Sequence, residues 1–303
     1  YVLSEMDAVA DPDTRSGLVK FDRALAGHIG YTIRNALRTI LLALTGGRLA
    51  RTPAGAAEVT VRYYRYLTRF CAAFTLLADI SMLLLGGKLK RKESLSARLG
   101  DCLSYLYYGS AVLKRFEDTG RPEEDLPLLH WSMRYCLHAI QQAILGIVNN
   151  YPVRIIGNLL RWGIFPLGAH FQPPSDRLGQ SVSSLLLRPG AARNRLTEGI
   201  FISQDPEDVT GCLEYALQLV IEAGAVENRV YKIAKFIYQS ADDEPRLQQA
   251  VRDGLISEDE AALLRRAVEA TLKVIHVDDF SREQVAQAVI KPAAGKRRDT
   301  KAA

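Results

Sequence analysis

The chain has 303 residues, a formal net charge of +5, 48% hydrophobic residues and 24% charged residues. These proportions are those of a globular protein and exclude a mostly disordered chain. The mean hydropathy of −0.03 excludes a polytopic membrane protein.

The first half of the chain shows the pattern of long helices. Apolar residues recur at intervals of three and four over residues 16–44, 53–85, 93–118 and 126–150. A glycine pair follows each of the first two segments, as is common just after a helix end. Because the connections between the segments are short, neighbouring helices should run antiparallel. We therefore expect residues 1–150 to form a long-helix bundle of the four-helix type.

Beyond the bundle, proline and glycine punctuate the chain repeatedly and predict shorter helices and loops. Asp205, which precedes a proline, has the character of a helix start, and Ser257 with Glu260 matches a capping box. We expect residues 151–290 to form a helical subdomain packed on the bundle, and residues 291–303 to form a flexible basic tail. Strand patterns are nearly absent, so the predicted fold class is all-α.

Positive charge is concentrated between residues 48 and 98, where ten Lys or Arg side chains oppose three carboxylates. The densest run lies at the start of the third predicted helix, the end where the helix dipole disfavours cations. This arrangement points to an external anion or a carboxylate-bearing partner, and a solvated loop is the alternative. The candidate patch consists of Lys88, Lys90, Arg91 and Lys92.

Aromatic and basic residues are interleaved early in the second predicted helix, in the run Arg62-Tyr63-Tyr64-Arg65-Tyr66 and then Arg69. Such interleaving can bind nucleic acid by stacking and phosphate contacts. On a helix, however, these side chains point in different directions. We therefore expect no single stacking platform and no nucleic-acid partner.

Three charged residues occur among apolar neighbours, where charges are normally paired. We expect Asp79, Arg98 and Asp101 to form a buried ion-pair network.

A short amphipathic segment follows the predicted bundle. Arg154 and Arg161 fall on one helical face, apolar residues including Trp162 cover much of the rest, and Phe165 follows. Such a segment can lie in a membrane interface, form an oligomer contact or be buried within the domain. The candidate interface residues are Arg154, Arg161, Trp162 and Phe165.

No catalytic or metal-binding constellation is recognisable in the sequence. The chain lacks a dinucleotide-binding glycine motif, a phosphate loop and a zinc-protease histidine motif. Its five histidines are scattered, and its four cysteines include no closely spaced pair. We expect structural histidines, buried free thiols in a reducing compartment, and no metal site.

Several blocks of residues, taken in order, resemble one family. The main blocks are residues 62–70, 86–93, 96–101, 125–131, 164–166, 174–176, 254–256 and 277–280. Together they resemble the C-terminal domain of the bacterial FadE-type acyl-CoA dehydrogenases, over nearly the whole chain.

The resemblance implies an FAD-dependent enzyme of fatty acid β-oxidation. Such an enzyme introduces a double bond between the α and β carbons of a medium- or long-chain acyl-CoA, and electron-transfer flavoprotein reoxidises the flavin. In that family the glutamate base and the flavin site belong to a catalytic core, which would precede Tyr1 of this chain. No catalytic or cofactor-binding residue is therefore assigned here, and we expect the chain alone to be inactive.

Residue 1 is Tyr1 rather than methionine, which agrees with a fragment of a longer protein. We expect the chain to be a structural and assembly extension of its own N-terminal catalytic core, in a homo-oligomer. A module that docks the enzyme on a membrane or a partner is the alternative. The resemblance implies the bacterial cytoplasm, with association with the inner membrane left open.

Overall fold

The computed structural model describes residues 1–276, 280, 282–283 and 285–286. It is 77% helical and has no strand among those residues, which confirms the predicted all-α fold. The chain divides into two compact units, Tyr1–Leu186 (unit 1) and Leu187–Ala303 (unit 2). The basic tail expected over residues 291–303 lies outside the described residues.

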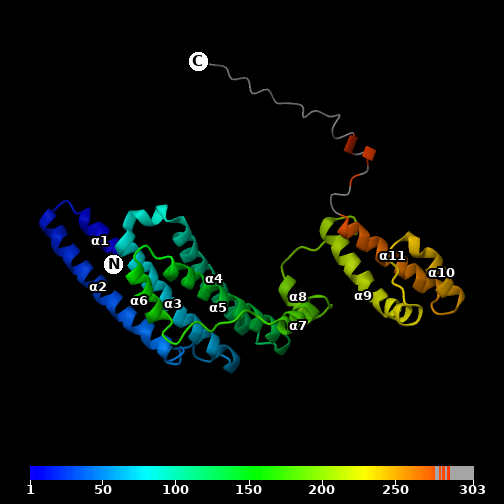
Figure 1. Cartoon of the computed structure of the whole chain (residues 1–303), viewed down its shortest axis with the longest axis horizontal. Helices are drawn as coiled ribbons and strands as arrows, with labels where there is room; N and C mark the ends of the chain where they lie inside the picture. The colour runs from blue at the N-terminus through cyan, green and yellow to red at the C-terminus, as the bar shows by residue number, and fades with distance from the viewer. Residues whose placement is uncertain (277–279, 281, 284, 287–303) are drawn as a thin grey trace, which may run out of the picture. The chain divides into compact units, whose positions relative to one another are not determined.

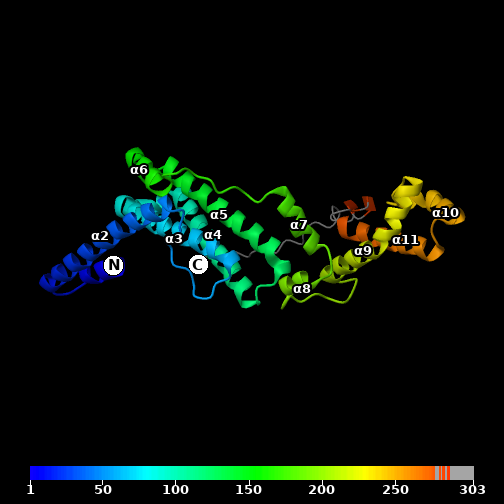
Figure 2. The ribbon, with the colours of Figure 1, turned by 90° about the horizontal axis from the view of Figure 1, so that it is seen from below.

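Unit 1 consists of α-helices and two 3-10 turns, and α3, α4 and α5 lie side by side in it (Figures 1 and 2). Its elements are α1 (Val2–Val9), α2 (Thr14–Leu44), α3 (Glu58–Leu85), η1 (Gly86–Arg91), α4 (Glu93–Asp118), η2 (Glu123–Asp125), α5 (Leu126–Asn149), α6 (Arg154–Ile164) and α7 (Asp176–Leu186).

The core of unit 1 is built from α3, α4, α5 and α6. Its largest fully buried apolar side chains are Phe70, Leu77, Leu113, Met133, Ile140, Ile144, Ile147 and Ile164. Because α6 contributes Leu160 and Ile164 to this same core, the boundary expected at residue 150 falls inside unit 1.

Helix α2 departs from the expected four-helix packing. Its repeating apolar residues Ile29, Ile33 and Leu37 are 52%, 55% and 64% exposed, whereas its buried positions are mostly small or polar, such as Asn35 and Thr39. The Asn35 amide donates to the carbonyl oxygen of Ala72 at 3.1 Å and so joins α2 to α3. The pattern predicted the helix correctly, but the exposed apolar face does not enter the core of unit 1.

The second predicted helix begins at Glu58 rather than at Pro53. Gly55, between them, has a φ of +75°, a conformation that a right-handed helix cannot include. The other three long helices end within two residues of the predicted bounds, as is usual for helix ends.

Unit 2 contains α8 (Ala191–Thr197), α9 (Val209–Ala234), η3 (Ala241–Asp243), α10 (Glu244–Arg252) and α11 (Glu258–Ile275). A separate core forms where α9, α10 and α11 meet, around Val230, Leu247 and Ala261. An Arg265–Glu244 ion pair of 2.6 Å joins α11 to α10.

Two helix starts in unit 2 were predicted from the sequence. The capping box of Ser257 and Glu260 is present at the start of α11, which confirms that prediction. The prediction for Asp205 was wrong, because Asp208 caps α9 by accepting hydrogen bonds from the backbone of Thr210 and Gly211. Asp208 has the better position, since an N-cap side chain must reach the amides two and three residues onward.

Candidate functional site

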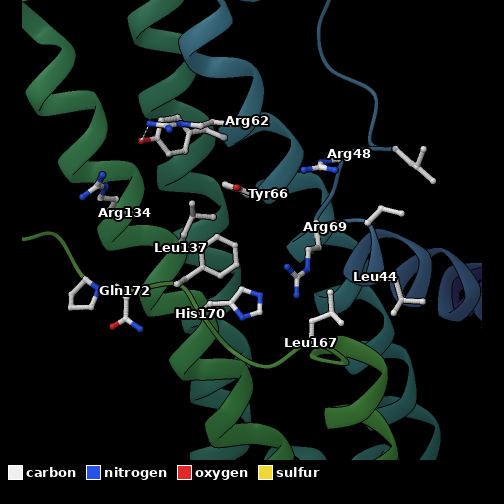
Figure 3. A pocket seen from close by; sticks show the side chains of 16 residues that line it. Leu44, Arg48, Arg62, Tyr66, Arg69, Arg134, Leu137, Leu167, His170 and Gln172 are labelled. Carbon is white, nitrogen blue, oxygen red and sulfur yellow. Dashed lines mark hydrogen bonds between the residues drawn. The ribbon is translucent and has the colours of Figure 1, made fainter.

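A cavity in unit 1 has a volume of about 790 Å³ and lies between α3, α5, the end of α2 and residues 167–173 (Figure 3). Four arginines line it, together with aromatic and leucine side chains. The arginines are Arg48, Arg62, Arg69 and Arg134, and the lining contains no Asp or Glu. We call this space the arginine cavity.

The sequence-based expectation that the aromatic-basic run points in all directions was only partly right. Arg62, Tyr66 and Arg69 recur at intervals of four and three, so they share one face of α3 and line the arginine cavity together. The helical period alone predicts that these three residues share a face. Predicting the cavity would also have required knowing which face of α3 borders it.

Arg69 is the most buried of the four arginines, with 4% of its surface exposed. One terminal nitrogen donates to the carbonyl oxygen of Ile164 at 3.2 Å, while its buried Nε has no hydrogen-bond partner. Its guanidinium lies 5.8 Å from the ring centre of Phe171. Burial lowers the pKa of Arg69 from its ordinary value, but an arginine retains its charge at neutral pH.

A histidine beside the cavity adds no charge to it. The Tyr63 hydroxyl lies 2.8 Å from Nδ1 of His130, and Arg62 donates to the same hydroxyl at 3.1 Å. Burial lowers the pKa of His130, and the charges of Arg62 and Arg134 lower it further. His130 is therefore neutral at pH 7, and the lining keeps the charge of its arginines.

One wall of the cavity is a loop that α5 holds in place. The Phe171 backbone N–H donates to the Gln141 side chain at 2.9 Å, and the Gln141 amide donates back to the Phe171 carbonyl oxygen at 2.9 Å. Nδ1 of His138 lies 2.8 Å from that same oxygen. These contacts fix the ring of Phe171 edge-on to Tyr66, with ring centres 5.1 Å apart.

The predicted cationic patch is present on the surface. Lys88, Lys90, Arg91 and Lys92 are all exposed, on η1 and the residue that follows it. Within the described part of the chain, none of the four forms an ion pair. Arg91 and Lys92 also line a smaller cavity of about 490 Å³, together with Arg98 and Asn150.

The predicted ion-pair network was wrong. Across the described residues, Asp79, Arg98 and Asp101 form no ion pair with one another, and Asp101 is exposed. Arg98 instead lies against Gly146 of α5, where an added Cβ would be 2.8 Å from its Nε. Asp79 is half-buried, one of its carboxylate oxygens has no partner, and burial raises its pKa. All three charges occur within apolar stretches of the sequence. Their positions around α3 and α4, however, point the side chains in different directions.

The four candidate interface residues, on α6 and its C-cap, differ in their exposure. Arg154 and Arg161 are exposed, and Arg161 donates to the Asn149 side chain at 3.1 Å. Trp162 is 65% exposed, whereas Phe165 is 7% exposed and belongs to the core. Ile155, Leu159 and Trp162 therefore form an exposed apolar row on α6, beside the exposed Arg154, Asn158 and Arg161.

The four cysteines differ in their burial. Cys102 and Cys136 are buried, as predicted, but Cys71 is exposed and Cys212 is partly buried. Burial raises the pKa of Cys102 to about 12 and that of Cys136 to about 11, so both stay protonated. The described residues contain no cluster of metal-binding side chains.

By length and composition alone, Glu58–Arg91 and Val209–Ala234 are long and apolar enough to cross a membrane. Both segments contribute side chains to cores, Phe70 and Leu77 in unit 1 and Val230 in unit 2. Core helices commonly pass this test, so the observation is weak evidence for a span.

The fold defines the chain as an all-α domain made of two helical units. A comparison with protein families then identifies it: the model for the bacterial-type C-terminal domain of acyl-CoA dehydrogenase matches residues 1–280, and the chain belongs to this family. No solved structure matches the chain. A C-terminal domain implies a parent enzyme with its own catalytic core.

Proposed function

We propose that this chain is the structural and assembly extension of an FAD-dependent acyl-CoA dehydrogenase that acts in fatty acid β-oxidation. Its exposed α2 face packs on the catalytic core and supports a homo-oligomer whose flavin is reoxidised by electron-transfer flavoprotein. The single observation that carries the proposal is the open apolar row on α2. The row is made of Leu18, Ile29, Ile33, Leu37, Leu41 and Leu44, each at least half exposed.

The α2 row has the dimensions of an interface rather than of scattered surface residues. At 1.5 Å per residue it extends along the helix for about 40 Å. A contiguous apolar stripe of this size on one helix marks a surface that another polypeptide or a membrane covers. The family assignment supplies a partner for it, since the parent enzyme has a catalytic core.

The flavin and the base are assigned to that core rather than to this chain. Acyl-CoA dehydrogenation needs a carboxylate base beside the flavin, and the arginine cavity has no carboxylate in its lining. The residues of this cavity therefore do not fit the reacting flavin site, and we derive no step through FAD here.

Charged substitutions on α2 test the proposal. Ile33→Asp with Leu37→Asp should leave the helical circular dichroism of the 303-residue chain unchanged, because both side chains are already exposed. The same pair should abolish binding of the chain to its separately produced catalytic core and reduce the oligomer size and activity of the parent enzyme. Arg34→Gln, an exposed change on the same helix, is the matched control. Unchanged binding, assembly and activity in the double variant would refute the proposal.

A second candidate function, docking on a membrane, rests on α6. Ile155, Leu159 and Trp162 are 74%, 64% and 65% exposed along one face, and exposed arginines flank them. This is the pattern of a helix that lies in a membrane interface, with the cationic patch of Lys88–Lys92 adding attraction to anionic lipid. The parent enzyme would then associate with the inner membrane.

Vesicle flotation separates this second candidate from the first. With vesicles of anionic phosphatidylglycerol, the full chain should float, and Trp162→Ser should weaken flotation several-fold. Phe201→Ser removes an exposed aromatic residue of unit 2, 82% exposed, and serves as the control. Absence of flotation at low salt contradicts membrane docking and leaves the α2 interface untouched.

A further inference from the structure

The arginine cavity holds charge that the chain itself does not neutralise. Arg69 is 4% exposed, and its Nε is buried without a partner. A buried charge without a counter-ion is energetically costly, so buried arginines are normally paired. Here the lining of the cavity adds Arg48, Arg62 and Arg134 instead of a carboxylate.

The neighbouring polar groups do not change this balance. Arg69 donates to one backbone carbonyl, and Arg62 donates to the Tyr63 hydroxyl, so both arginines are bonded only to neutral groups. Among the ion pairs of the described residues, none includes Arg48, Arg62, Arg69 or Arg134. His130, whose Nδ1 lies 2.8 Å from the Tyr63 hydroxyl beside the cavity, is neutral at pH 7 and adds no charge.

We propose that the arginine cavity binds the phosphoryl group of an organic phosphate. Guanidinium groups present paired N–H donors that match phosphate oxygens, and a phosphate dianion would neutralise two of the four charges. The buried Nε of Arg69 would gain the acceptor that it lacks. This inference does not rest on the α2 row or on α6, although Leu44 at the end of the α2 row also lines the cavity.

The remaining walls indicate an organic ligand rather than free phosphate. Leu44, Leu49, Leu137 and Leu167 line the cavity together with Tyr66, Phe171 and His170. Its volume of about 790 Å³ is within the range of small-molecule sites and far exceeds a phosphate ion. Since Gln141 and His138 hold Phe171 in place, the aromatic wall is preformed, which favours binding of a ring or an apolar chain.

Calorimetric titration of the full chain tests the proposal, with ADP and pyrophosphate as soluble probes and acetate as a control for charge alone. A separate arm uses vesicles that contain phosphatidic acid, because a lipid headgroup offers the same phosphoryl chemistry. We expect ADP to bind more tightly than pyrophosphate, and acetate not to bind. Raising the salt concentration should weaken binding.

The variants remove surface arginines of the cavity first, because these changes should not disturb folding. Arg62→Gln and Arg134→Gln are both exposed positions and should each weaken binding about tenfold. Arg69→Met removes the buried guanidinium, and its thermal unfolding should be measured beside its binding. Arg154→Gln, an exposed arginine of α6 outside the cavity, is the matched control and should bind normally.

The arms give separate outcomes. ADP binding that Arg62→Gln and Arg134→Gln reduce supports a soluble organic phosphate. Capture by phosphatidic acid vesicles that the same variants reduce, without ADP binding, supports a lipid phosphate. The proposal is overturned if ADP does not bind at millimolar concentration and phosphatidic acid vesicles do not capture the chain. It is also overturned if Arg154→Gln weakens binding as much as the cavity variants do.

Discussion

Glu117 at the end of α4 binds the start of α3: its Oε1 accepts the backbone N–H of Ala57, the N-cap residue of α3, at 3.1 Å. The same oxygen accepts the Thr60 hydroxyl at 2.5 Å, and Oε2 accepts from Arg121 at 2.6 Å. Because Ala57 has no side chain that can cap α3, the carboxylate from α4 supplies an acceptor for the N-cap amide, the role that an N3 glutamate has in a capping box. Two long helices of unit 1 are thereby tied at one end.

Glu117→Ala should therefore destabilise unit 1 by about 2 kcal/mol, the sum expected for a lost cap and a lost charge-assisted hydrogen bond. Urea unfolding followed by circular dichroism measures this difference. Asp118→Asn is the control, because Asp118 is exposed and forms a solvent-exposed ion pair with Lys114 one turn away. Equal losses in the two variants would show that the cap contributes nothing.

The Glu117 contacts also have a pH dependence. Burial raises the pKa of Glu117, but the hydrogen bonds from Thr60, Ala57 and Arg121 outweigh it, and the net pKa is lowered below 4.5. A lowered folded-state pKa means that the stabilisation is present above the unfolded-state pKa and is lost as the pH falls through the folded-state value. The difference in stability between wild type and Glu117→Ala should therefore shrink below about pH 4, which acid titration of the unfolding midpoint can measure.

Asp79 should show the opposite behaviour. Burial raises its pKa above 3.8 in the folded chain, so its contribution is most favourable below the unfolded-state pKa and declines as the pH rises through the folded-state pKa. At pH 7 the partly buried, charged carboxylate lowers the free energy of unfolding. Asp79→Asn should therefore stabilise the chain by about 1 kcal/mol.

The control for Asp79→Asn is Asp101→Asn, at an exposed position of α4. Thermal unfolding at pH 7 and at pH 3.5 gives both comparisons. The stabilising effect of Asp79→Asn should be small at the lower pH, where the wild-type carboxyl is already protonated. A loss of stability at pH 7 would indicate that the carboxylate has a partner after all.

The sequence predicted the helices of unit 1 well and their environment less well. Periodicity locates α2 because Ile29, Ile33 and Leu37 share one face, but periodicity does not reveal what covers that face. Burial needs the packing partner, and the partner of this face is not among the helices of unit 1. The same limit explains Phe165, which sequence reasoning grouped with exposed Trp162 although the chain turns it into the core.

The arginine cavity was not predicted for a related reason. Arg62 and Arg69 were noticed as part of one run, but Arg48, Arg134 and the loop at Phe171 come from three other parts of the chain. Their meeting depends on how α2 and α5 pack beside α3, which is long-range information. The exposed run Lys88–Lys92 was easier to find, because a local charge cluster requires no tertiary contact.

The loop that forms one wall of the arginine cavity should depend on Gln141. This side chain is 3% exposed and makes hydrogen bonds to both backbone groups of Phe171. Gln141→Leu keeps the approximate size but removes both bonds and leaves a backbone N–H without a partner, at a cost of about 2 kcal/mol. Gln142→Leu alters the next, exposed residue and should change stability by less than about 0.5 kcal/mol. Hydrogen exchange of the Phe171 amide should accelerate only in the first variant.

Glycine at position 157 lets α6 approach the end of α5. A Cβ at Gly157 would lie 2.5 Å from the backbone oxygen of Val148 and 2.9 Å from Cβ of Tyr151, so neither neighbour can move without shifting backbone. Gly157→Ala should therefore destabilise unit 1 by about 2 kcal/mol or more through overpacking. Gly30→Ala provides the opposite case, because a Cβ there meets nothing within 4 Å in the interior of α2, and it should stabilise by about 0.5 to 1 kcal/mol. Chemical unfolding of both variants measures the pair, and a stabilising Gly157→Ala would mean that α6 does not pack against the end of α5 in this way.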